Sequence, residues 1–262
     1  MAEPSLPPEV TAPLPTAPPR PRRELPASPF AGDDGARPPA FTAAKAVEPP
    51  ERTPAVVRAL RGGRVLVPVL PHAHPGRTTA GGVQDHVKSF GADPEAEACE
   101  QAATVTVDVA DGRAAMPAFS SLAALLAWNP EARPVPVFGE QAARAAATVS
   151  DGLMLLDPGD EPVLIPRPAV RALAVGAEWV PSWADEGLGP VAAAALAGIE
   201  ELVGVRIEPG RTTEIRVVVA IRRGLDADRL RDVLTRTAAA LSEDATLRER
   251  VDSMELYPTS LA

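Results

Sequence analysis

The side chains best suited to hold a metal ion gather in one stretch of this sequence. His72, His74 and His86 lie within residues 72–102, together with Cys99, the only cysteine of the chain. A His-x-His pair could offer two imidazole nitrogens to a metal, with the thiolate of Cys99 as a third ligand. The spacing matches no zinc pattern, and a glycine-containing loop is a poor rigid scaffold for a metal. We therefore expect solvated loop histidines, and we predict no metal site and no cofactor.

The sequence shows no recognisable motif for nucleophilic or acid–base catalysis. The sequence contains no G-x-S-x-G, H-E-x-x-H, phosphate-binding loop or dinucleotide-binding fingerprint. Ser120 and Ser121 stand before an apolar run, where a serine caps a helix. Asp157 and Asp160 flank a Pro-Gly pair, which is typical of a type II turn, so their carboxylates are expected to serve that turn. The sequence therefore predicts no catalytic residue.

Two arginines are better placed to bind a ligand. Arg133 and Arg167 each stand beside a proline where a helix and a strand are expected to meet. Arg167 also falls at the start of a helix, whose free backbone N–H groups favour an anion. If the fold brings both guanidinium groups together, they could bind a small carboxylate or phosphate; the commoner alternative is that each pairs with an acid or a loop carbonyl. Trp128 is expected in the core or at the same binding surface.

Charge and hydropathy limit the partners. The net charge is −9, and an acidic surface repels phosphate backbones, which excludes nucleic acid and anionic membranes as expected partners. The longest apolar stretch, PVAAAALAGIEEL, is too short and too alanine-rich to span a bilayer. The first ten residues do not resemble a signal peptide. We expect a cytoplasmic protein whose partner is an unknown protein or a small metabolite.

Proline content sets the expected organisation of the N-terminal part. The chain has 31 prolines, and they are densest in residues 1–52, where the apolar residues show no period. These residues are predicted to form a disordered Pro-rich tail. Residues 72–102 also lack periodicity and are predicted to form a mobile loop.

Hydrophobic patterns predict a first mixed domain over residues 53–175. A helix is expected to start at Thr53 and to be followed by an apolar strand, RVLVPVLP. The Asp111-Gly112 pair, between alternating valines and a second apolar run, predicts a hairpin. The serine-capped helix SLAALLAW and further short helices and strands complete the domain.

Residues 176–189 are predicted to be a linker, and a second mixed domain follows over residues 190–262. Alternating apolar residues in TEIRVVVAIR predict a strand. Asp226 is expected to cap a long helix that carries a single apolar stripe. The predicted fold class is therefore α+β, with two small domains in tandem after the tail.

Three segments together resemble a known family: VRALRGGRVLVPV, DGRAAMPAFSSLAALLAWNPEARPVPV and LMLLDPGDEPVLIPRPAVRALA. They are similar to the N-terminal domain of the SseB family, named for enhanced serine sensitivity, and residues 190–257 resemble its C-terminal domain. The resemblance implies no established catalytic activity and no cofactor. It suggests a non-catalytic cytosolic protein that binds a protein partner or a small metabolite and is linked to serine or amino-acid physiology. The alternative is an enzyme or ligand sensor with a small-anion site at Arg133 and Arg167.

Overall fold

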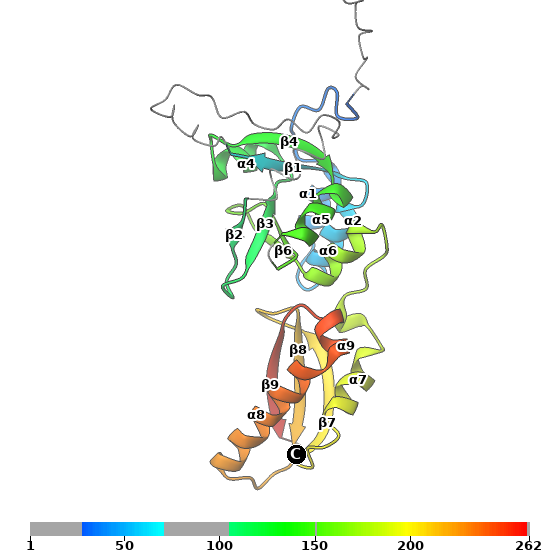
Figure 1. The fold of residues 1–262 in the computed structure, drawn as a ribbon, viewed down its shortest axis with the longest axis vertical. Helices are drawn as coiled ribbons and strands as arrows, with labels where there is room; N and C mark the ends of the chain where they lie inside the picture. The colour runs from blue at the N-terminus through cyan, green and yellow to red at the C-terminus, as the bar shows by residue number, and fades with distance from the viewer. Residues whose placement is uncertain (1–27, 71–104, 150, 261–262) are drawn as a thin grey trace, which may run out of the picture. The chain divides into compact units, whose positions relative to one another are not determined.

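A computed structural model describes residues 28–70, 105–149 and 151–260 (Figure 1). Its elements, up to the linker, are α1 (Pro39–Lys45), α2 (Arg52–Leu60), β1 (Arg64–Val69), β2 (Val107–Asp108), β3 (Ala114–Ala118), α4 (Leu122–Trp128), β4 (Arg133–Phe138), α5 (Gly139–Thr148), β5 (Leu153–Leu156), β6 (Val163–Ile165) and α6 (Arg167–Ala174). After the linker come η1 (Ser182–Ala184), α7 (Leu188–Ala195), β7 (Leu202–Pro209), β8 (Ile215–Ile221), α8 (Ala227–Glu243), α9 (Ala245–Arg250) and β9 (Met254–Ser260). Helices and sheets are mixed, which confirms the α+β class.

Three small sheets organise these elements. β1 pairs with β4 in an antiparallel two-stranded sheet, and β2, β3, β5 and β6 form a four-stranded sheet in that order. Within the second sheet, β3 and β5 are parallel, while the outer pairs are antiparallel. The third sheet has the order β7-β8-β9, with β8 and β9 parallel.

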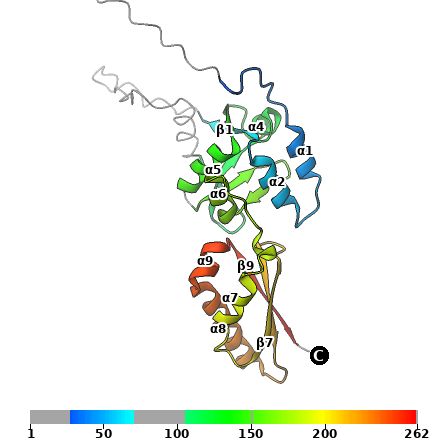
Figure 2. The ribbon, with the colours of Figure 1, turned by 90° about the vertical axis from the view of Figure 1, so that its right-hand side faces the viewer.

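The chain's low aromatic content makes its cores aliphatic. One core joins α1, α2, α5 and α6 to the strands beside them, and its wholly buried members include Phe41, Leu60, Met154 and Ile165. A second, separate core lies between the β7-β8-β9 sheet and the helices α7, α8 and α9, which cover one face of that sheet (Figure 2). β8 contributes side chains to this core. Buried and half-buried residues alternate at both ends of the strand, because successive side chains of a strand point to opposite faces of the sheet.

Local turn and cap signals are confirmed. Gly112 has φ +81° in the turn that joins β2 to β3. The Ser121 hydroxyl accepts a hydrogen bond from the Ala124 N–H at the start of α4, and the Asp226 carboxylate accepts one from the Arg229 N–H at the start of α8. Such caps satisfy N–H groups that have no partner inside the helix.

Order begins earlier in the chain than the proline pattern predicts. We predicted a tail over residues 1–52, but α1 lies within that range and its Phe41 is wholly buried in the first core. The physical reason is that Pro38, Pro39, Pro49 and Pro50 bracket the segment rather than interrupt it. Proline is tolerated in the first turn of a helix and beyond its end.

Candidate functional site

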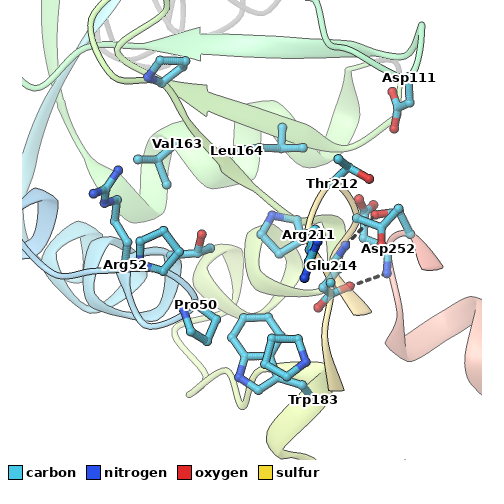
Figure 3. A pocket seen from close by; sticks show the side chains of 18 of the residues that line it. Pro50, Arg52, Asp111, Val163, Leu164, Trp183, Arg211, Thr212, Glu214 and Asp252 are labelled. Carbon is cyan, nitrogen blue, oxygen red and sulfur yellow. Dashed lines mark hydrogen bonds between the residues drawn. The ribbon is translucent and has the colours of Figure 1, made fainter. Parts of the chain in front are cut away.

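A cleft of about 290 Å³ is lined by loops from both halves of the described chain (Figure 3). Its lining comes from the start of α2 and the segment before it, the β2–β3 hairpin, β6, the linker, the β7–β8 turn and the segment between α9 and β9. The residues are Pro49, Pro50, Arg52, Thr53, Asp111, Arg113, Pro162, Val163, Leu164, Pro166, Trp183, Pro209, Gly210, Arg211, Thr212, Thr213, Glu214, Asp252 and Ser253.

Proline rings, Trp183 and aliphatic side chains make the apolar part of this lining. Figure 3 shows Pro50 and Trp183 near each other on one side and Val163 and Leu164 on the opposite side. Trp183 is half-buried, because its ring also packs against the second core. A concave apolar surface with a few polar groups is the usual form of a small-molecule site.

Arg113 carries the strongest ion pair of the cleft. Its two terminal nitrogens each donate to one carboxylate oxygen of Asp252 at 2.8 Å, and the Asp252 side chain is almost wholly buried. Its Nε also donates to Asp111 at 2.7 Å. This hydrogen bond lowers the pKa of Asp111, and the bonds to Asp252 and then Asp111 raise the pKa of Arg113. The guanidinium of Arg113 is therefore fully engaged within the protein.

Glu214 is held differently, because no cation among the described residues contacts its carboxyl group. The Oε1 atom lies 2.5 Å from the Ser182 hydroxyl, and Oε2 accepts a hydrogen bond from the Asp252 N–H at 2.6 Å. The same Ser182 hydroxyl donates to the Arg250 carbonyl at 2.9 Å. Burial is the main cause that raises the pKa of Glu214. Together, Ser182, Glu214, Asp252 and the Arg250 carbonyl are called the Glu214 network below.

Two further guanidinium groups line the cleft without an acid partner in the described ranges. Arg52 donates from Nε to the Val47 carbonyl at 2.9 Å, and its terminal nitrogens make no ion pair there. The backbone N–H of Arg211 donates to Glu255, while its guanidinium makes no ion pair within the same residues. Figure 3 shows these two side chains on different sides of the cleft. The charge of Arg211 is nevertheless one of the causes that lower the pKa of Glu255, so it is partly balanced within the protein.

The arginines predicted from the sequence lie in different elements. Arg167 opens α6 and donates to the carbonyls of Arg248 and Val251 at 3.3 and 3.1 Å. Its Nε is buried without a hydrogen bond in the described structure, 3.9 Å from an Asp252 oxygen. Arg133 is exposed at the start of β4, opposite Val69 of β1. No hydrogen bond or ion pair joins the two arginines in the described ranges, and an anion site formed by both stays a prediction.

Trp128 packs against the first half of the chain. Its ring lies 5.3 Å from the ring of Phe119, measured between centroids, and it borders a small core formed around Leu66, Phe119 and Leu125. The side chain is half-buried, so it contributes to packing while keeping one edge open.

A second cluster of polar side chains, the Lys45 network, is sunk in the first half of the chain. The Lys45 ammonium donates to Asp157 Oδ2 at 3.0 Å and to the Asp160 carbonyl at 2.7 Å. The Ser120 hydroxyl and N–H donate to the two Asp157 oxygens at 2.6 and 2.7 Å. Arg37 closes the network by donating to Ser120 and Asp160. Asp157 and Ser120 are wholly buried, and their polar atoms bond to other members of the network.

Sequence reasoning missed Glu214, Arg113 and Lys45. We predicted that Ser120 and Asp157 serve only a cap and a turn; both also belong to the Lys45 network. The pairs join residues 112 and 139 positions apart, as in Lys45–Asp157 and Arg113–Asp252, and no local pattern announces them. One usable signal was that Lys45 is one of only two lysines in an arginine-rich chain.

The predicted loop histidines and Cys99 lie outside the described residues. Within the described ranges, no group of three or more His, Cys, Asp or Glu side chains is arranged to hold a metal ion. No helix in the same ranges is both long and apolar enough to cross a membrane.

Comparison with known proteins identifies a family. A family model described as SseB protein N-terminal domain matches residues 39–172. The matched range begins at α1 and so includes Lys45, Ser120 and Asp157, together with Arg52 and Val163 of the cleft. No curated protein and no solved structure matches the chain.

Proposed function

The chain belongs to the SseB family, and we propose that it acts by binding a small metabolite in the cleft, without catalysing a reaction. The observation that carries the proposal is a concave lining that combines apolar side chains with charged groups. Glu214, Asp252 and Arg113 are bonded to one another's residues and to Ser182. The terminal nitrogens of Arg52 make no ion pair with a described residue, and the half-buried Trp183 also lines the cleft.

Binding is favoured over catalysis by the contacts of Glu214. A carboxyl group with a raised pKa in a cleft is a candidate general acid. A general acid must reach the substrate directly or through one water molecule. Both Glu214 oxygens are already occupied by Ser182 and by the Asp252 N–H, so the group joins protein segments instead.

The size of the cleft favours a small molecule over a protein segment. Its volume of about 290 Å³ lies at the lower end of the range for ligand pockets. Proline side chains supply much of the apolar lining, and they keep their shape without losing rotamer freedom when a ligand binds. A location in the cytoplasm and a link to serine or amino-acid physiology belong to the same proposal, supported by family membership.

The test blocks the cleft and measures which compounds still stabilise the protein. Thr212 lines the cleft and is exposed, so Thr212→Trp fills the opening without changing a core residue. Thr235 is exposed on α8, away from the cleft lining, so Thr235→Trp is the matched control. The full chain and both variants are screened for thermal stabilisation with serine, other amino acids and common organic acids and phosphates.

We expect at least one compound to stabilise the unmodified chain and Thr235→Trp but not Thr212→Trp. Ligand-induced stabilisation grows with the ratio of ligand concentration to Kd, so saturating ligand gives a clear shift. A ligand that stabilises all three proteins equally would place binding elsewhere and contradict the proposal. A screen without any stabilising compound would also contradict it.

A further inference from the structure

We propose that residues 248–253 form a polar latch between the two halves of the chain, and that breaking its Arg113–Asp252 ion pair lets the halves turn apart and opens the cleft. The first half comprises α1 to α6, the second half comprises α7 to β9, and residues 175–187 are the linker between them. The inference concerns the motion of the two halves. It requires no ligand and so stands apart from the proposed function.

The two halves do not share a core. The buried residues of the first core all come from the first half, and those of the second core all come from the second half. Among the described residues, no helix or strand of one half packs extensively against a helix or strand of the other. Relative motion is the expected behaviour of domains that are not joined by a large apolar interface. The contacts that hold these halves together are therefore made by loops and polar side chains.

The polar contacts between the halves converge on one short segment, which lies between α9 and β9. Both terminal nitrogens of Arg113, in the β2–β3 turn, donate to the Asp252 carboxylate at 2.8 Å. Arg167, at the start of α6, donates to the carbonyls of Arg248 and Val251 at 3.3 and 3.1 Å. The bidentate pair is the strongest of these contacts, because two parallel charge-assisted hydrogen bonds join an arginine to an almost wholly buried carboxylate.

The latch segment is also bonded to its own half and to the linker. The Ile215 N–H donates to the Ser253 carbonyl at 3.2 Å, and Glu214 accepts a hydrogen bond from the Asp252 N–H at 2.6 Å. The Ser182 hydroxyl of the linker donates to the Arg250 carbonyl at 2.9 Å. These bonds do not involve the first half. The segment therefore keeps its place in the second half when the arginines of the first half release it.

Arg167 shows that the latch is less well satisfied than a core. Its Nε atom is buried and has no hydrogen-bond partner among the described residues, and an oxygen of Asp252 lies 3.9 Å away. A buried donor without an acceptor costs free energy. When the halves separate, water can accept a hydrogen bond from this N–H, so opening recovers part of that cost.

Two tryptophans of the linker provide the pivot. Trp179 packs against the first core and Trp183 against the second, and their rings meet edge-on with centroids 6.4 Å apart. Figure 3 shows Trp183 at one end of the cleft and Asp111, which bonds to Arg113, at the other. The linker is covalent and the latch is not. Loss of the Arg113–Asp252 pair should therefore let the halves turn about the linker and widen the cleft.

The test measures distances between spin labels on the full chain by electron paramagnetic resonance. Cys99, the only cysteine, is replaced by serine. One label pair, on cysteines at Ala147 of α5 and Thr235 of α8, spans the two halves, and both positions are exposed. A second pair, at Val203 of β7 and Thr235, lies within the second half and reports whether that half keeps its fold. No ligand is added, so the outcome is independent of the ligand screen.

The distance distributions are compared between the labelled chain, Arg113→Gln and Arg216→Gln. Arg216 is the matched control, because its 2.8 Å ion pair with Glu255 joins two strands of the second half and does not reach the first. Asp252→Asn is a further variant that removes the other partner of the latch pair. It retains the backbone N–H that donates to Glu214.

We expect Arg113→Gln to add a population with a longer Ala147–Thr235 distance, or to raise its share relative to the closed population about tenfold, because hydrogen bonds between charged groups are lost from the closed state. Asp252→Asn should change the distribution in the same direction, and it decides the question if Arg113→Gln does not fold. The Val203–Thr235 distribution should stay the same in every chain, and Arg216→Gln should change neither pair.

Two results would overturn the inference. An Ala147–Thr235 distribution that stays unchanged in the folded latch variants would show that the ion pair does not hold the halves together. A change in the Val203–Thr235 distribution of the latch variants would show that the second half loses its fold instead of moving as a unit.

Discussion

The Lys45 network and the Glu214 network are both buried polar clusters, yet they compensate charge in opposite ways. Asp157 is wholly buried beside the ammonium of Lys45, which is itself almost wholly buried, and the two neutralise each other. Glu214 has no contacting cation in the part of the chain that the structure describes, where Arg113 pairs with Asp252. Burial raises the pKa of Glu214 instead. One network holds a charged pair, and the other holds a buried carboxyl group with a raised pKa.

Only one of these two networks borders the cleft that we propose as a ligand site. A buried ion pair needs both partners, so the Lys45 network fixes α1 against the turn after β5 and leaves nothing unpaired. The Glu214 network lies in the cleft lining, where the terminal nitrogens of Arg52 make no ion pair with a described residue.

The largest loss of stability is expected from shortening the chain at its N-terminal end. This change should affect the first core and leave the core at the β7-β8-β9 sheet unchanged. A chain that begins at residue 53 loses Phe41 and Lys45, which leaves a large void in the first core and an unpaired charge at Asp157. We expect this first core to lose its cooperative melting transition, since each loss alone is worth about 3–5 kcal/mol. A chain that begins at residue 28 retains both residues and is the matched control.

Differential scanning calorimetry of both shortened chains provides the measurement. The core formed by the β7-β8-β9 sheet contains no residue from the deleted segment, so its transition should survive in both chains. Two unchanged transitions in the chain that begins at residue 53 would show that α1 is not needed by the first core.

A smaller but still large effect is expected from Lys45→Met. This substitution keeps an unbranched side chain but leaves Asp157 as a buried carboxylate without its cation. We expect the free energy of unfolding, measured with urea, to fall by about 3–5 kcal/mol. Adding Asp157→Asn removes the unpaired charge, and Asn tolerates the positive φ of this position. The double variant should therefore be more stable than Lys45→Met; equal stability would mean that charge is not the cause.

Sequence patterns predicted the features that depend on neighbours in the chain. Asp111-Gly112, Ser121 and Asp226 each act within three residues of their own position, where turn and cap chemistry is set. The alternation along β8 likewise reports one local fact, which face of the strand is buried. The fold class followed from such signals.

The candidate site could not be predicted in this way. Arg113 and Asp252 lie 139 positions apart, and neither is distinguished by its flanking residues. Lys45 was the exception, because a lysine in a chain that otherwise uses arginine marks a position that requires a compact ammonium. AFTAAK, between two proline pairs, also carried a helix signal that the surrounding prolines obscured. Pairs of residues that are far apart in the chain therefore cannot be predicted from composition and local patterns alone.

The smallest effect, expected from Glu214→Gln, tests the raised pKa of Glu214 directly. The glutamine amide can donate to Ser182 and its carbonyl can accept from the Asp252 N–H, so it replaces the protonated acid group for group. Below the ordinary pKa of 4.5, the unmodified chain and the variant should have nearly equal free energies of unfolding. Above 4.5 the unfolded glutamate releases its proton while the folded one keeps it. Stability relative to the variant therefore falls as pH rises through the folded pKa.

Glu255→Gln gives a control with the opposite sign. The Arg211 N–H is the first cause that lowers the pKa of Glu255, so this carboxylate stabilises the folded state above 4.5 and loses that contribution as pH falls through the folded pKa. Relative to Glu255→Gln, the unmodified chain should thus become more stable as pH rises toward 4.5. Urea unfolding across both pH windows measures the two slopes. If the free energy of unfolding of the unmodified chain, relative to Glu214→Gln, rises with pH above 4.5, the pKa of Glu214 is not raised in the folded protein. The proposed difference between the two networks would then be wrong.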